Sequence, residues 1–152
     1  DTIKILNQKY KIKVFENILD GSENFALIKG KISPRKNIRV RVISSNLVQN
    51  YLMGKKFPDL FNKTIKYFKN LNNCVLVFIK DTNLKSVTQT LSAYKNLKGL
   101  KKSDQMIRNY GIGAQIIKSL NIKNMILVTR SPKKVVSLEG FGLKIIKQEI
   151  IK

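Results

Sequence analysis

The six-residue run Cys74-Val75-Leu76-Val77-Phe78-Ile79 is apolar at every position and lies between Asn72-Asn73 and Lys80-Asp81. A short apolar run with polar ends is typical of a strand that is buried on both faces of a sheet. The run Asn124-Met125-Ile126-Leu127-Val128-Thr129 has the same character. Helical patterns lie between the two runs, so we predict units in which buried strands alternate with helices.

The first quarter of the chain is expected to be rich in strands. Apolar and polar residues alternate over Asn37–Ser44, and a turn containing Pro34 separates this predicted strand from another over Asn24–Ile32. Apolar side chains recur at helical spacing over Asp59–Leu71, with lysines on the other face. Further helices are expected over Ser86–Leu97, Tyr110–Leu120 and Pro132–Leu138, and a closing strand over Gly142–Ile150. These elements predict one mixed α/β domain (α+β), residues 1–152, with a mixed β-sheet flanked by helices.

The composition excludes several chemistries. Cys74 is the only cysteine and histidine is absent. No internal disulfide, imidazole base or zinc site built from several His or Cys ligands is therefore available. No apolar run reaches the roughly 18 residues that a membrane-spanning helix needs. We expect a soluble, cytoplasmic protein without a membrane partner, and a start at Asp1 without Met indicates a processed chain or a piece of a longer one.

The formal net charge of +21 is the strongest compositional signal. A field of this size attracts polyanions and predicts salt-sensitive binding to nucleic acid or acidic surfaces. Most of the basic residues are lysines spread along the whole chain, and Ile and Asn are also abundant. These residues share AT-rich codons, so a compositional drift of the genome is the alternative explanation for the charge.

The second half of the chain carries a specific signature. The segment Arg108–Ile117 (RNYGIGAQII) resembles the RDYGIGAQIL segment of GTP cyclohydrolase II, particularly the form fused behind dihydroxybutanone phosphate synthase. Further on, Asn124–Lys134 and Leu138–Leu143 resemble that family's LLTNNPKK and LEGYGL segments. Upstream, Phe25–Gly30 and Val40–Ser45 are similar to its FALVKGD and VRVHSE segments. The resemblance implies a GTP cyclohydrolase II-like fold, a homodimer, and a dihydroxybutanone phosphate synthase domain as a fused partner.

The same resemblance implies a zinc site that this chain lacks. The family uses zinc, held by three cysteines, and magnesium to open the guanine ring of GTP with release of formate and pyrophosphate. The three cysteine positions fall on Asn46, Phe57 and Asp59, which are poor zinc ligands as a set. We therefore predict no metal site and no cofactor. The family's Gln-Glu-Gly-Arg loop is also replaced, by Asp81-Thr82-Asn83-Leu84.

Some functional positions of the family are retained. Arg108 matches its proposed nucleophile and Tyr94 an active-site tyrosine, so these two are the candidate catalytic residues. Arg41, Thr129 and Lys134 match residues that contact nucleotide or phosphate. A proline-led helix after a buried strand, at Pro132, also suits an anion on general grounds. A helix-start role for Arg108 and a core role for Tyr94 are the structural alternatives.

Three functions follow from these observations. The first is a degenerate, catalytically inactive GTP cyclohydrolase II-like domain of riboflavin biosynthesis. It would keep a structural, dimerisation or regulatory role toward a dihydroxybutanone phosphate synthase, with weak binding of GTP or phosphate. The second is an active GTP cyclohydrolase II with unusual ligands. The third is a polyanion-binding module, although neither stacking aromatics nor a nucleic-acid motif is evident.

Overall fold

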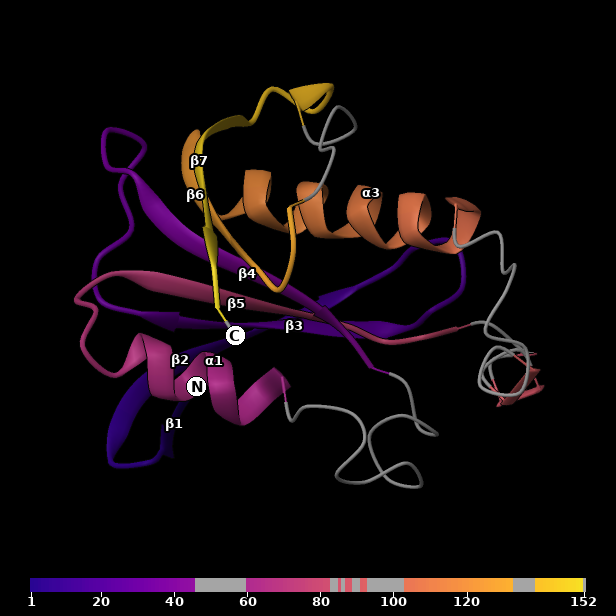
Figure 1. Cartoon of the computed structure of the whole chain (residues 1–152), viewed down its shortest axis with the longest axis horizontal. Helices are drawn as coiled ribbons and strands as arrows, with labels where there is room; N and C mark the ends of the chain where they lie inside the picture. Colours follow the sequence, from indigo (N-terminus) through magenta and orange to yellow (C-terminus); the bar gives the residue numbers. More distant parts are fainter. Residues whose placement is uncertain are drawn as a thin grey trace.

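The computed structural model describes residues 1–45, 60–82, 85, 87–88, 91–92, 103–132 and 139–151, with the backbone alone for residues 103–109. Its described strands form a seven-stranded sheet in the order β1-β2-β3-β5-β4-β6-β7. The strands are β1 (Thr2–Ile5), β2 (Gln8–Glu16), β3 (Glu23–Lys29), β4 (Ile38–Ser44), β5 (Cys74–Ile79), β6 (Asn124–Thr129) and β7 (Lys144–Ile150). Two helices have defined bounds, α1 (Leu60–Phe68) and α3 (Ser103–Ser119). The expected mixed α/β fold is confirmed (Figure 1).

The sheet has an antiparallel part and a parallel part. Strands β1, β2, β3 and β5 pair antiparallel in that order. Strand β4 pairs parallel with both β5 and β6, and β6 pairs parallel with β7. Parallel neighbours need a crossover between them, and α1 supplies it between β4 and β5. The parallel part therefore has the alternation of strand and helix that the sequence predicted.

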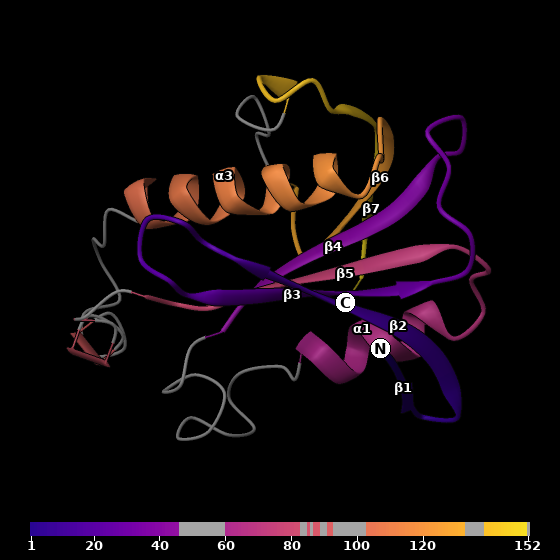
Figure 2. The same ribbon diagram turned by 180° about the vertical axis from the view of Figure 1, so that it is seen from behind.

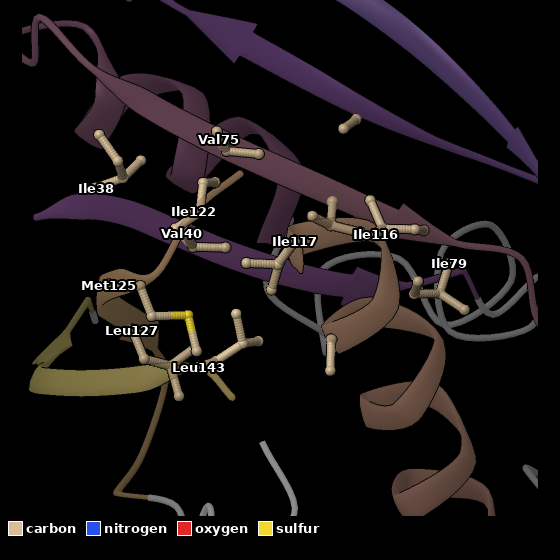
Figure 3. Close-up of a cluster of buried hydrophobic side chains, with 13 residues drawn as sticks. Ile38, Val40, Val75, Ile79, Ile116, Ile117, Ile122, Met125, Leu127 and Leu143 are labelled. Carbon is tan, nitrogen blue, oxygen red and sulfur yellow. The ribbon is translucent and has the colours of Figure 1, made fainter. Parts of the chain in front are cut away.

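The two helices cover opposite faces of the sheet. Figure 1 shows α3 on one side of the central strands and α1 on the other, and Figure 2 shows the same arrangement from behind. Under α3, Val40, Val75 and Ile117 belong to one buried apolar cluster, shown in Figure 3. Under α1, Ile65 and Phe68 pack in a second cluster. Both faces of the central strands are thus covered, as parallel sheets require.

Most predicted elements are confirmed. The buried strands Cys74–Ile79 and Asn124–Thr129 match β5 and β6, and β5 is buried at five of its six positions. The predicted strands Asn24–Ile32, Asn37–Ser44 and Gly142–Ile150 correspond to β3, β4 and β7, and the predicted helix Asp59–Leu71 corresponds to α1. Of the predicted helix Ser86–Leu97 only Val87, Thr88, Leu91 and Ser92 are described, and all four are helical. Residues 133–138 of the predicted helix at Pro132 lie outside the described part.

Two predictions were incomplete at their ends. Helix α3 begins at Ser103 instead of Tyr110 and runs through Gly111 and Gly113. The helix lies so close to the sheet at Gly113 that a Cβ there would lie 3.3 Å from Cγ1 of Val42, and this close approach favours glycine within the helix. The prediction also named no strand before Asn24, although β1 and β2 pair as a hairpin. Lysines alternate with apolar residues in these strands, so the apolar signal of the sequence is weak there. Only Tyr10 of β2 is fully buried.

Within the described residues, no helix combines the length and the apolar character that crossing a bilayer requires.

A polar network fastens the edge strand β7 to β4 and α1. The Arg39 guanidinium donates from Nε to Oε2 of Glu149 at 2.9 Å and from Nη2 to Oε1 at 3.1 Å. The hydroxyl of Tyr67 donates to the same carboxylate. These hydrogen bonds, the Arg39 ones first, lower the pKa of Glu149. The network therefore stabilises the folded state through the ionised form of Glu149.

We expect Glu149→Gln to lower the free energy of unfolding at pH 7 by about 1–2 kcal/mol, since charge-assisted hydrogen bonds are lost. Because the folded-state pKa is lowered, this stabilisation is complete above the unfolded pKa and disappears as the pH falls through the folded value. The difference from wild type should accordingly shrink below about pH 4. Urea denaturation between pH 3 and 7 measures it, and Glu139→Gln, at an exposed carboxylate, is the control. A difference that is constant with pH would contradict this assignment.

Candidate functional site

The carboxyl ends of β4, β5 and β6 lie at one edge of the sheet, because these strands are parallel. In open α/β sheets, ligands bind outside this edge. The turns that leave it are tied together by two hydrogen bonds. The backbone N–H of Ser45 donates to the carbonyl of Ile79 at 2.8 Å, and the N–H of Asp81 donates to Oγ of Ser45 at 3.0 Å. This edge is the place to look for a site.

Arg41 is the most unusual side chain near this edge. It lies on β4, is only 5% exposed, and belongs to the same face of the strand as Arg39 and Ile43 by the alternation of a β-strand. Its Nη1 donates to the carbonyl of Val128 at 3.2 Å, and its buried Nε has no hydrogen-bond partner within the described part of the chain. The guanidinium is thus buried with part of its donor capacity unused.

The electrostatic surroundings of Arg41 are unfavourable to its charge. Burial lowers the pKa of Arg41, the positive charge of Arg130 lowers it further, and Tyr110 opposes the shift. Neither of the salt bridges found among the described residues includes Arg41. A buried cation without a counter-charge costs several kcal/mol of solvation free energy, of order 3–5 when a partner is missing. An anion bound beside Arg41 would offset that cost.

Thr129 ends β6 and is 5% exposed. Its Oγ1 accepts a hydrogen bond from the backbone N–H of Ser131 at 3.0 Å and donates to the carbonyl of the same residue. The hydroxyl thereby shapes the turn in which Arg130 lies, next to the edge of the sheet. Thr129 and Arg41 lie on the neighbouring strands β6 and β4. Arg41 donates to the carbonyl of Val128, the residue before Thr129, so the two side chains are close to the same point of the sheet.

Two residues of this site had no predicted role. Tyr110 of α3 is half-buried, and burial raises the pKa of its phenol while Arg41 lowers it. In the sequence Tyr110 is distinguished only as part of the motif RNYGIGAQII. The one sequence signal for Arg130 is its position directly after a buried strand. The roles of Tyr110 and Arg130 follow from their proximity to Arg41 in the fold, and the spacing of residues in the sequence does not reveal that proximity.

The other predicted site residues are not all described. Arg108 lies in the described backbone of α3, but its side chain lies outside the described part of the structure. Tyr94 and Lys134 lie wholly outside the described residues, as do Asn46, Phe57 and Asp59, the positions of the family's three cysteines. These assignments stay predictions.

The described residues contain no group of three or more His, Cys, Asp and Glu side chains arranged to hold a metal ion. Cys74 is fully buried in β5, and burial raises the pKa of its thiol to about 12. At neutral pH this sulfur is protonated, whereas metal binding requires the thiolate.

Comparison with known proteins gives a consistent relationship. The family model described as GTP cyclohydrolase II matches residues 2–150. The chain is 29% identical to the riboflavin biosynthesis protein RibBA of Aquifex aeolicus, over 94% of this chain and 38% of that protein. It is 32% identical to the bifunctional riboflavin biosynthesis protein RIBA 1, chloroplastic, of Arabidopsis thaliana, over 87% of this chain and 27% of the relative. With the monofunctional RIBA 2 of the same plant the identity is 30%, over 90% and 30%. The chain thus spans well under half the length of these relatives.

The state of Arg41 leads to a stability prediction. In a buffer without phosphate or sulfate, Arg41→Met should leave the free energy of unfolding unchanged or raise it by about 1–4 kcal/mol, because removal of a buried cation that has no described counter-charge outweighs the lost hydrogen bond to Val128. Arg39→Met, which leaves Glu149 without its bidentate partner, should cost about 2 kcal/mol. Urea denaturation of both variants at pH 7 compares the two arginines directly. Equal losses would mean that Arg41 has a counter-charge of its own.

Proposed function

Because the chain belongs to the GTP cyclohydrolase II family, we propose that it is a catalytically inactive member that has kept an anion-binding site. The observation that carries the proposal is the buried, partly unsatisfied guanidinium of Arg41 beside a second cation and without a described carboxylate partner. A chain that had lost every function of the site would gain stability by replacing such a group. Retention of Arg41 therefore points to an anion that the protein still binds.

The loss of catalysis is inferred from the chemistry of the available donors. The family's reaction depends on zinc, and the three corresponding positions are Asn46, Phe57 and Asp59. A phenylalanine offers no ligand, and an amide with one carboxylate is a poor set for a metal that prefers nitrogen and sulfur donors. The chain has no histidine, and its single thiol is protonated in the core. These residues do not fit a catalytic zinc ion.

The anion that suits the site is a phosphate group, free or on a nucleotide such as GTP. Guanidinium groups bind phosphate through charge-assisted hydrogen bonds, and backbone N–H groups at a strand-to-helix turn add further donors. We assign phosphate contacts to Arg41, Thr129 and Lys134, and add Arg130 because its charge acts on Arg41. Arg108 and Tyr94 keep the family's catalytic positions, but without the metal they have no ring-opening step to serve.

The biological role we propose is structural or regulatory. The relatives are longer proteins of riboflavin biosynthesis, and one of them is named bifunctional. In this proposal the domain forms a homodimer and supports a dihydroxybutanone phosphate synthase to which it is fused. Control by an anion would require that binding at Arg41 is coupled to the synthase by a free energy of about 1–3 kcal/mol.

The inactive state is tested by incubating the purified chain with GTP, Mg²⁺ and excess Zn²⁺. Formate and pyrophosphate are then assayed, with the Aquifex aeolicus relative treated in parallel. We expect neither product from this chain, because Asn46, Phe57 and Asp59 do not suit the zinc ion that would activate water. Release of formate above the no-protein background would refute the loss of catalysis, and elemental analysis showing one zinc per chain would refute the metal argument independently.

The anion site is tested by thermal and urea denaturation with inorganic phosphate, triphosphate or GTP. A ligand at ten times its Kd stabilises the folded state by about 1.4 kcal/mol. We expect stabilisation of this size for wild type and for Arg35→Met, whose arginine is exposed before β4, and none for Arg41→Met. Sodium chloride at equal ionic strength is the reference, since any salt screens the repulsion within a chain of +21 charge. Equal stabilisation of all three proteins would mean general screening and no site.

A further inference from the structure

The turn between β2 and β3, residues 17–22 and hereafter the β2–β3 tip, exposes two large aliphatic side chains. Ile18 is 98% and Leu19 is 94% exposed, the highest values among the large apolar residues described. A single exposed aliphatic residue is ordinary on a protein surface, but two adjacent ones held almost wholly in water indicate an interaction site when their surroundings are also apolar.

Hydrogen bonds hold the backbone of the tip in one conformation. The N–H of Asn17 donates to the carbonyl of Ser22, and the N–H of Gly21 donates to the carbonyl of Asn17, both at 2.8 Å. The side chain of Asn17 accepts from the N–H of Leu19 at 3.1 Å, and the carboxylate of Asp20 accepts from the N–H of Ser22 at 2.9 Å. The aliphatic side chains are therefore presented by an ordered turn, which lowers the entropy cost of binding through them.

A hollow of about 260 Å³ adjoins the tip. Phe15 and Ile18 line one side, and Ile112, Gln115, Ile116 and Ser119 of α3 line the other. The four α3 residues follow the spacing of one helix face. Figures 1 and 2 both show the β2–β3 turn beside α3. The tip and the hollow together form one surface in which apolar side chains alternate with amides and a hydroxyl.

The segment Glu16–Glu23 carries only negative charge, opposite to the net charge of the chain. Glu16 and Glu23 are register partners on β2 and β3, and Asp20 lies between them in the tip. Neither glutamate takes part in a salt bridge among the described residues. Like charges directly opposite each other destabilise a strand pair. Three of the nine acidic residues thus lie within eight positions of the sequence. The rest of the chain contains the other six acidic residues and all 30 basic residues.

We propose that the β2–β3 tip and the hollow beside α3 form the surface through which two copies of this chain associate. Each copy would place its tip against a lysine-bearing surface of the other, related by a twofold axis. A second copy suits the charge, because the chain outside the tip is strongly basic. Contact between the tips of two copies is disfavoured, since it would bring together Asp20 and the flanking Glu16 and Glu23 of both copies, six carboxylates in all. This inference rests on the homodimer of the proposed function and names its surface.

Area considerations favour this larger surface over the tip alone. A stable interface buries about 800 Å² on each partner, which is far more than two aliphatic side chains provide. Insertion of Ile18 and Leu19 therefore has to be accompanied by contacts along the hollow and the exposed carboxylates. The apolar residues would supply most of the affinity, and the carboxylates would select the register by pairing with lysines of the partner.

The first test measures the oligomeric state by sedimentation equilibrium for wild type and for Ile18→Ser/Leu19→Ser. The control is Leu6→Ser, which removes an exposed leucine from the β1–β2 turn. We expect a dimer for wild type and the control, and at least a tenfold higher dimer Kd for the double variant. Glu16→Lys/Glu23→Lys should weaken the dimer by a similar factor. Unchanged thermal midpoints of the diluted, monomeric variants show that folding is intact.

The second test uses the wild-type chain alone. A water-soluble carbodiimide joins a carboxylate to a lysine amine with loss of water, and mixing ¹⁵N-labelled with unlabelled protein identifies bonds between copies. We expect Glu16, Asp20 or Glu23 to be linked to lysines of the other copy. A dimer that survives both tip variants and yields no such link overturns the surface but leaves the homodimer intact. A wild-type chain that stays monomeric, or whose tip is covered only by another domain of a longer protein, overturns both, while the anion site is judged separately.

Discussion

The parallel pairing of β4 with both β5 and β6 places β4 at the centre of the sheet, where helices cover both faces. A charged residue buried on this strand, such as Arg41, loses its hydration and needs a partner to offset that cost. Two arginines, Arg39 and Arg41, occupy one face of it. Arg39 is bonded to Glu149 through both nitrogens of its fork, whereas the described contact of Arg41 is a single carbonyl. Arg39 thus forms an ion pair within the fold, whereas Arg41 forms none among the described residues.

This contrast separates stability from function within a single strand. The Arg39 pair stabilises the attachment of β7 whether or not a ligand is present. Arg41 has no counter-charge among the described residues, and this is the observation on which the proposed anion site rests. Arg130 strengthens this conclusion, because a second cation near the first worsens the ligand-free state and improves the one that holds an anion.

The buried strands and the alternation of β4 were predictable from residue pattern, because a strand covered on both faces leaves an uninterrupted apolar run and β4 keeps period two. Helix α3 was predicted too short because glycines at 111 and 113 suggest a helix start, while the close approach to Val42 that accommodates Gly113 is a tertiary fact. The position of Arg41 on a strand was predictable, but its electrostatic surroundings were not, because they depend on Arg130 in the turn after β6 and on Tyr110 of α3, which only the fold brings near it.

The same reasoning bears on the origin of the +21 charge. The few acidic residues differ in what they contact. Glu149 bridges β4, β7 and α1. Glu16 and Glu23, which flank the β2–β3 tip, are different, because they oppose each other across a strand pair and neither forms a salt bridge among the described residues. Drift is one explanation for the many lysines, but it does not account for two opposed carboxylates that form no salt bridge in the described part of the chain, whereas lysines of a second copy would pair with them.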